Sequence, residues 1–484
     1  MYRPYFKLSL MKFLFTPLLF ILCYTSISQD THYWALQFGT RSSLMGGAVV
    51  GRVKDNSAIF YNPACLAFID TSSVSINADL YQLEKTRIEN ALGKEKDFNN
   101  DNFKNLPLLI SGLIPTKNPN IKMGYGLASS VDYGFKGFAR IDGNYPVVSD
   151  AESPGDEATI GQLSLNSRIT ETTVGYGIGK KFNDRWSLGA TILFLWREHG
   201  YERSLFTRMF LNTAGNPLVS ADYMQNFSYH NLRSQLKFGI YYTGDHFDIG
   251  LAVNSPSFKI FGKGVVAADI TANNILYHGQ RMDILANDRQ DNLPSVYKTP
   301  WSAATGINID MRRGQLGIAL QYYAGLEIYD ILKAKPAAFV RPQQAIADVG
   351  SDELLRVKTG NKSVVNWAVA YEYIINSKFT LDLSFRSDNS FFEKAVHDTR
   401  GIKPDISTWD IYHAVVGGNV SGRRLSVSTG VLFGFGGSKK YEQDGNLEEP
   451  SETNFLQGHT IITKASYYSI GVLFGITINF NKKS

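Results

Sequence analysis

The stretch from Tyr468 to Phe480 near the end of the sequence alternates between two kinds of residue. Its odd positions are small or polar, apart from Leu473, and its even positions are apolar: Tyr468, Ile470, Val472, Phe474, Ile476, Ile478 and Phe480. This period of two is typical of a strand in a transmembrane barrel wall, with one face towards lipid and the other towards a lumen. A strand of a soluble sandwich can show the same alternation, so the choice depends on the rest of the chain.

Similar segments recur along the chain, and their connections alternate between short and long. Six connections are tight turns and the seven others have about 16 to 40 residues, an arrangement typical of outer-membrane barrels. The predicted strands are Ser72–Leu83, Leu106–Pro115, Ile121–Ala139, Leu163–Lys181, Arg185–Arg208, Phe227–Thr243, His246–Phe258, Lys298–Asp310, Gly314–Glu327, Ser363–Ile375, Lys378–Ser390, Thr408–Val420, Leu425–Ser438 and Ala465–Phe480. The sequence therefore predicts an all-β fold, an antiparallel transmembrane barrel of about 14 strands over residues 71–484.

Two of the long connections have room for structure of their own. They are Lys259–Tyr297 and Ile328–Lys362, and the second contains a predicted short helix over Ala345–Leu355. Loops of this length are usually functional or disordered.

The first 28 residues have the features of a secretory signal. A hydrophobic region from Phe13 to Cys23 follows Lys12, and small residues at Ser26 and Ser28 indicate cleavage before Gln29. Beyond the signal, the best apolar run is Leu106–Ile114, well short of the roughly 18 residues of a spanning helix. Since only helices and closed barrels satisfy their backbone groups in lipid, we expect a multi-pass barrel in the outer membrane of a Gram-negative bacterium.

Charge and cysteine content exclude other classes of protein. The formal net charge of +5 falls to about +2 when Arg3, Lys7 and Lys12 leave with the signal, which argues against a nucleic-acid-binding protein. Cys65 is then the only cysteine, so the mature chain forms no internal disulfide.

The sequence lacks the patterns of a catalytic site. There is no Gly-x-Ser-x-Gly elbow, and none of the eight histidines, including His413 on the twelfth predicted strand, lies in a recognisable nucleophile context. Metal-ligand spacings, phosphate loops and dinucleotide fingerprints are also missing after the signal. We expect no enzyme activity and no cofactor, and a function in binding and passage.

Alternation places three cations on the inward face of the fifth and sixth predicted strands. Arg197, Arg233 and Lys237 are therefore candidates to bind the carboxylate of an amphiphilic ligand. In the alternative interpretation these cations pair with acids in the lumen, such as Glu171, Glu372 or Asp382.

The segment before the first strand, residues 29–70, is rich in small residues and does not alternate. It contains Asn62-Pro63-Ala64, preceded by Asp55-Asn56-Ser57-Ala58-Ile59-Phe60-Tyr61, and earlier Gly39, Arg41–Leu44 and Gly46-Gly47-Ala48; Leu66-Ala67-Phe68 follow. This stretch resembles the N-terminal hatch of FadL-type outer-membrane transporters, and Ser255-Pro256-Ser257 resembles that family's element after the seventh strand. Cys65 stands where the family usually has a small residue, and Asn481–Ser484 extend past the usual terminal aromatic residue.

The resemblance implies a function as well as a fold. FadL-type proteins are fourteen-stranded barrels with a hatch in the lumen, and they carry long-chain fatty acids or other hydrophobic compounds inward. For this chain we expect such uptake to need no energy input. The resemblance also implies a hydrophobic ligand, contact with outer-membrane lipid and a gate formed by residues 29–70, with candidate residues Gly46, Gly47, Asp55, Asn62, Pro63 and Ala64. We expect a monomer.

Two other functions are compatible with the sequence. FadL-like barrels of the PorV kind serve as protein partners in secretion systems, and a nonspecific polar porin would have a similar pattern of strands. The sequence patterns alone do not distinguish these two functions from uptake of hydrophobic compounds.

The third predicted strand is a candidate for a lateral exit into the bilayer. Glycine within a strand often marks a bulge or kink where ladder hydrogen bonds are lost. The predicted exit residues are Gly134, Phe135, Gly137 and Phe138. In the alternative interpretation these glycines only relieve crowding against the hatch.

Overall fold

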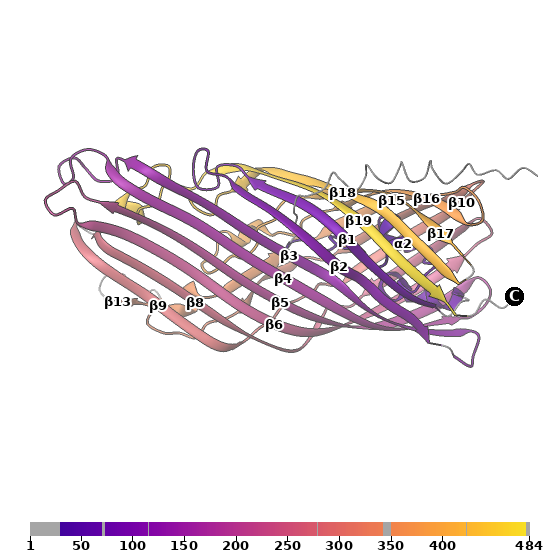
Figure 1. The fold of residues 1–484 in the computed structure, drawn as a ribbon. Coiled ribbons are helices and arrows are strands. Elements are labelled where there is room, and N and C mark those ends of the chain that lie inside the picture. Colours follow the sequence, from indigo (N-terminus) through magenta and orange to yellow (C-terminus); the bar gives the residue numbers. More distant parts are fainter. Residues whose placement is uncertain are drawn as a thin grey trace, which may run out of the picture.

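The protein is a closed antiparallel β-barrel (Figure 1). The computed structural model describes residues 30–69, 73–114, 116–277, 279–341, 350–422 and 424–480. Within these ranges the wall has fourteen strands: β1 (Ser73–Ile88), β2 (Phe98–Ile114), β3 (Ile121–Tyr145), β4 (Glu157–Lys181), β5 (Trp186–Phe210), β6 (Leu218–Thr243), β7 (Phe247–Asn254), β10 (Ser302–Met311), β11 (Gly314–Tyr323), β15 (Val364–Ile374), β16 (Phe379–Asp388), β17 (Ile411–Ser421), β18 (Leu425–Glu442) and β19 (Ile462–Asn479).

The wall closes where the first strand meets the last. β1 pairs antiparallel with β19 from Ser73 opposite Asn479 to Ile88 opposite Ala465, and with β2 on its other side. Closure leaves no strand edge exposed to lipid. The predicted fold and all fourteen predicted strands are confirmed, with the short turns at one end and the long loops at the other.

The half of the wall next to the short turns carries an outward band of apolar side chains. On β5 this band runs from Trp186 to Trp196 and includes Leu188 and Ile192, whereas Glu198 is the next outward residue. The two tryptophans mark a span close to the roughly 9–11 residues that a strand needs to cross the hydrocarbon, and aromatic girdles lie at both interfaces of such barrels. The chain is therefore a multi-pass outer-membrane protein whose short turns face the periplasm.

Strands β3 to β6 continue well beyond this band, as Figure 1 shows. They have 25 or 26 residues each. β4 begins at Glu157 instead of the predicted Leu163, and β2 at Phe98 instead of Leu106. The predicted starts were wrong because outward residues above the membrane face water and no longer carry the apolar alternation that marks a wall strand.

The predicted connection Lys259–Tyr297 forms a hairpin of β8 (Phe258–Tyr277) and β9 (Gln280–Pro294). β8 pairs with the outer half of β6, from Ser234 opposite Phe258 to Ser220 opposite Asn273. It therefore adds a strand to the tall sheet, the part of the wall that β3 to β6 form beyond the apolar band. β9 in turn pairs with β13 (Val340–Arg341).

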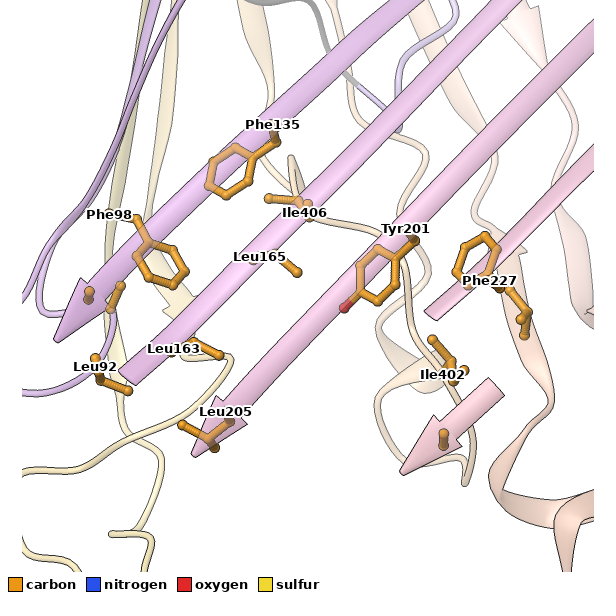
Figure 2. Packing of buried hydrophobic residues seen from close by; sticks show 14 of the residues in the cluster. Leu92, Phe98, Phe135, Leu163, Leu165, Tyr201, Leu205, Phe227, Ile402 and Ile406 are labelled. Atoms are coloured by element: carbon orange, nitrogen blue, oxygen red, sulfur yellow. The ribbon is translucent and has the colours of Figure 1, made fainter. Parts of the chain in front are cut away.

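A hydrophobic core fills the loop end of the molecule. Phe98, Phe135, Leu163 and Tyr201 on the inner face of the tall sheet pack against Ile406 and other loop residues (Figure 2). The short elements inside the barrel and in its loops are α2 (Thr40–Leu44), α3 (Ala58–Tyr61), η2 (Pro63–Phe68), β12 (Leu326–Leu332), α4 (Ser351–Leu354), β14 (Val357–Asn361), η3 (Lys394–Val396) and η4 (Glu452–Asn454). The outer half of the barrel is thus a folded cap rather than an open mouth.

Some predictions lie outside the described residues. These are the signal, Asn481–Ser484 and most of the first half of the predicted helix Ala345–Leu355, within whose second half α4 is found. No helix in the described ranges is long and apolar enough to cross a membrane.

Candidate functional site

The N-terminal segment, residues 30–69, lies inside the barrel and contacts every wall strand. Asn56 donates from Nδ2 to the carbonyls of Ser73 on β1 and Ser111 on β2, at 3.1 and 3.3 Å. Asn62 donates to the carbonyl of Ile240 on β6 at 3.0 Å and to that of Val50 at 3.1 Å. Its Oδ1 accepts from the Ala64 N–H, which caps η2. The Asn-Pro-Ala motif therefore fixes a turn of the segment against the wall.

Glycines on the lumen face of the wall make room for this segment. At Gly189 a Cβ would meet the Pro63 backbone, at Gly250 the Val50 carbonyl and at Gly317 the Ala48 carbonyl, each closer than real Cβ atoms come. Glycine within a strand commonly marks such a close approach of another backbone. Gly306 likewise faces the backbone of the segment, and the glycines whose Cβ would meet its side chains are Gly126, Gly177, Gly239, Gly417, Gly430 and Gly475.

The remaining predicted gate residues are turn residues of the segment. Gly46 and Gly47 follow α2 with φ of 57° and 83°, the left-handed conformation that glycine adopts readily at helix ends. Asp55 accepts from the Ser57 N–H at 2.9 Å and fixes the turn before α3. These contacts position the segment inside the barrel.

Ion pairs attach the segment to the wall near the short-turn end. Glu372 on β15 contacts Arg41 at 2.5 Å and Lys54 at 3.1 Å. Arg52 pairs with Asp248 on β7 and, at 2.5 Å, with Asp310 on β10. Two of the predicted luminal acids therefore have partners other than the three predicted cations. Glu372 pairs with the segment, and Asp382 accepts from Asn419 at 2.6 Å.

The segment and the wall together line a lumen cavity of about 160 Å³, which brings together the three predicted cations, Arg197, Arg233 and Lys237. A large part of its wall is aromatic or apolar. Tyr33 stacks on Tyr323 with ring centroids 4.1 Å apart and lies 4.5 Å from Phe391. The other aromatic and apolar residues of the lining include Trp34, Phe38, Phe60, Tyr61, Leu193, Leu195 and Tyr297.

Two of the three cations already have partners. Glu171 on β4 lies 3.4 Å from Arg197 and 2.7 Å from Arg233. Both guanidinium groups also lie over the ring of Tyr297, at 4.0 and 4.8 Å from its centroid. For these two residues the alternative prediction of pairing with a luminal acid agrees with the geometry.

Lys237 differs from the two arginines. It lines the same cavity and is 6% exposed, and no carboxylate within the described parts of the chain lies at ion-pair distance from it. A buried ammonium group without an acidic partner is a natural place for an anionic ligand group. Lys237 is therefore the strongest candidate of the three for binding a ligand.

The start of the segment is fastened to the loop between β16 and β17. The carboxylate of Asp30 accepts from the backbone N–H groups of Ile406 and Ser407, at 2.6 and 2.9 Å. Phe391 N–H donates to the Thr31 carbonyl at 2.9 Å, and a ring nitrogen of His32 lies 2.9 Å from the Trp409 carbonyl oxygen. Structure on the outer side of the membrane is thus bonded directly to the segment in the lumen.

The wall is broken beside the cavity, where β3 leaves β2. These strands pair only from Ile114 opposite Met123 to Ile110 opposite Leu127. Just above, the pairing of β3 with β4 shifts between Ser129 and Val131, and Ser130 and Val131 line the cavity.

The four predicted exit residues lie above this bulge, in regular register with β4. Phe135 is buried in the outer core, and a Cβ on Gly137 would meet the ring of Phe98. Phe138 is 58% exposed on the outer surface of the wall. Gly134 faces Arg168 and Asn102.

Several known structures have folds similar to that of this chain. A Pseudomonas aeruginosa FadL homologue superimposes with a TM-score of 0.60 at 14% identity, covering 94% of this chain and 100% of that chain. The P. putida toluene transporter TodX gives 0.55 at 13% identity, with 92% and 99% covered. The Ralstonia pickettii toluene transporter TbuX gives 0.52 at 13% identity, with 92% and 98% covered.

The chain has the same fold as these three proteins. The FadL-type resemblance of the N-terminal motif is thereby confirmed for the architecture of the whole barrel. No protein-family model matches the sequence, and a comparison with curated proteins gives no match.

Several residues of the site were not predicted from the sequence. Tyr297 reaches the two arginines from the end of a long connection, and Tyr33, Tyr323 and Phe391 come from three distant parts of the chain. Alternation identifies inward residues on one strand, but it does not show which loop residues fold back over them.

We expect Gly189→Val to displace the N-terminal segment, because the added methyl groups would overlap the backbone of Pro63 and Ala64. Overpacking of this kind costs about 1–3 kcal/mol. The variant should show higher conductance to small ions in a planar bilayer than the parent protein. Gly200→Val on the same strand is the control, since nothing lies within 4 Å of a Cβ there; equal conductance of the two variants would contradict the account.

We expect the attachment of the segment to the outer loop to weaken as pH rises. Burial raises the pKa of Asp30 to about 6 and that of Asp405 to about 8, and in the detached state both return towards the ordinary value of about 3.9. The attached state therefore holds protons that the detached state releases, so its stability is greatest below about pH 4 and falls up to about pH 8. Channel openings should be more frequent at pH 8.5 than at pH 5, and Asp405→Asn should remove most of this difference.

Proposed function

We propose that this protein admits hydrophobic compounds with an acidic group, such as long-chain fatty acids, across the outer membrane without energy input. The observation that carries the proposal is an aromatic-lined cavity holding Lys237, a buried cation without a carboxylate partner in the described chain. Transporters with this fold include two described as toluene transporters, which supports a hydrophobic ligand.

The size of the cavity limits what it holds as it stands. Cavities of about 150 Å³ accommodate a single benzene ring, whereas drug-sized ligands need roughly 300 Å³ or more. A long acyl chain therefore requires the aromatic residues of the N-terminal segment, Tyr33 and Phe38 among them, to move aside. This is the physical basis on which we propose that residues 30–69 act as a gate.

An apolar ligand gains little by entering the aqueous periplasm, so we propose that it leaves sideways into the bilayer. The route runs from the cavity past Ser130 to the place where the β2–β3 ladder ends at Leu127. Ser130 is the tenth residue of β3 and lies within the span that crosses the hydrocarbon. The exit proposed here therefore lies a few residues closer to the short turns than Gly134 and Gly137, where the sequence predicted it.

Replacing Lys237 with Met should weaken binding of hexadecanoate about tenfold, equivalent to ~1.4 kcal/mol, because the carboxylate loses its cation. Binding of hexadecanol, which has no charge, should change little. Lys263→Met on the exposed hairpin is the control. The two ligands can be compared by displacement of a fluorescent fatty acid from the purified barrel, and an equal loss for both would refute the anion-binding role of Lys237.

Replacing Ser130 with Phe should slow uptake of a labelled fatty acid about tenfold, because the ring would obstruct the break in the wall. Ser234→Phe, on the lipid side of β6 where the ladder with β5 is continuous, is the matched control. Uptake is measured in cells, with barrel abundance checked by the change of gel mobility on boiling. Normal uptake by the Ser130 variant would exclude this exit.

A further inference from the structure

The break between β2 and β3 widens above the membrane into a slot in the outer wall. There the outer half of β2 pairs with β1, and the outer half of β3 pairs with β4. The opening has a volume of about 660 Å³. A hydrogen bond of 2.9 Å from the Lys136 N–H to Asn100 Oδ1 spans it.

The lining of the slot is rich in side-chain amides. Phe135 lines the slot on its inner side and lies near Phe98 in the outer core, with ring centroids 6.2 Å apart (Figure 2). The walls of the slot carry both charge signs together with amides that donate and accept hydrogen bonds: Asn99, Asn100, Asp101, Asn102, Lys136, Asn166 and Arg168. Arg168 is itself paired with Asp132 at 2.7 Å.

Asn100 has an unused donor in this slot. The side chain is 4% exposed and its Oδ1 is occupied by the bond to Lys136, whereas its Nδ2 is buried without a hydrogen-bond partner. Buried polar groups in folded proteins nearly always have a partner, so an orphaned amide facing a cavity indicates a missing one.

The height of the slot restricts what can reach it. Its residues lie about 13 to 16 positions from the short-turn ends of β2, β3 and β4, whereas crossing the hydrocarbon takes roughly 9–11 residues. At about 3.3 Å per residue along strands tilted by about 45°, the slot lies on the order of 5–12 Å above the hydrocarbon. That is the level of the polar head groups and first sugars of the outer leaflet.

We infer that this slot binds a sugar of the outer-leaflet glycolipid, lipopolysaccharide. Sugar hydroxyls both donate and accept, which matches a lining of amides, whereas the presence of Asp101 beside Lys136 disfavours a simple anion and the polar walls disfavour a hydrocarbon. The bound sugar accepts from Asn100 Nδ2 and occupies the break in the wall above the bulge. This site goes beyond the proposed transport function and does not depend on it.

The test measures binding of glycolipid to the full barrel in detergent by native mass spectrometry. The probes are lipopolysaccharide with its core sugars, lipid A without them, and the free core oligosaccharide. Asn100→Asp keeps the acceptor for Lys136 and removes the donor, so it should weaken binding of intact lipopolysaccharide about tenfold. Asn144→Asp, on the exposed outer face of β3 beyond the slot, makes the same change of charge and should leave binding unaltered.

A second variant, Asn166→Leu, removes an exposed amide of the slot and guards against a folding defect at the buried Asn100. Loss of binding in both variants, with the change of gel mobility on boiling preserved, supports the site. Lipid A binding as tightly as intact lipopolysaccharide would overturn it, because no sugar would then be recognised. If the free oligosaccharide bound as tightly as lipopolysaccharide, the ligand would be a soluble saccharide, and the proposal of a membrane glycolipid would be wrong.

Discussion

The architecture depends on one hydrogen-bonded ladder, the pairing of β1 with β19 that closes the wall. In lipid, an unpaired strand edge would leave a row of backbone groups without partners, at a cost of several kcal/mol each. Closure at fourteen strands fixes the width of the lumen, and that width is more than wall side chains alone fill. The N-terminal segment occupies the remaining space, and the aromatic cavity is what it leaves open.

The fit of the segment is achieved on both sides of the contact. The wall contributes glycines where the segment backbone approaches, and carboxylates where Arg41, Arg52 and Lys54 reach it. The segment contributes turn residues such as Gly46, Gly47 and Asn62 that bring its backbone close to the strands. Attachment at the short-turn end is mainly ionic, whereas attachment at the loop end is made by buried hydrogen bonds of Asp30 and Thr31. The two ends therefore respond to different conditions, salt at one and pH at the other.

The sequence predicted the part of the fold that faces lipid, because lipid imposes an apolar residue at every second position. It predicted neither the outer halves of β2 and β4 nor the β8–β9 hairpin, where outward residues face water. Alternation placed Arg197, Arg233 and Lys237 on the inward face, and the structure shows that they line one cavity. The sequence did not show that the two arginines are paired and the lysine is not, because this depends on where Glu171 lies on the neighbouring strand and where Tyr297 lies in a loop. The bulge at Ser129–Val131 was missed by a few residues, since a bulge is a property of two strands in register and glycines in one strand only suggest it.

The N-terminal segment also constrains the order in which the molecule is assembled. It touches all fourteen wall strands, yet it is joined to β1 by only three residues, and its backbone lies against wall glycines with no room for a side chain between them. A chain so enclosed cannot be threaded in after the wall has closed, so the strands must gather around it. The ladder that completes the wall joins residues about 400 positions apart, and contacts so distant in the chain form slowly. The N-terminal segment is therefore fully enclosed only when the last strand pairs with the first, and it acts as an internal template around which the wall strands assemble.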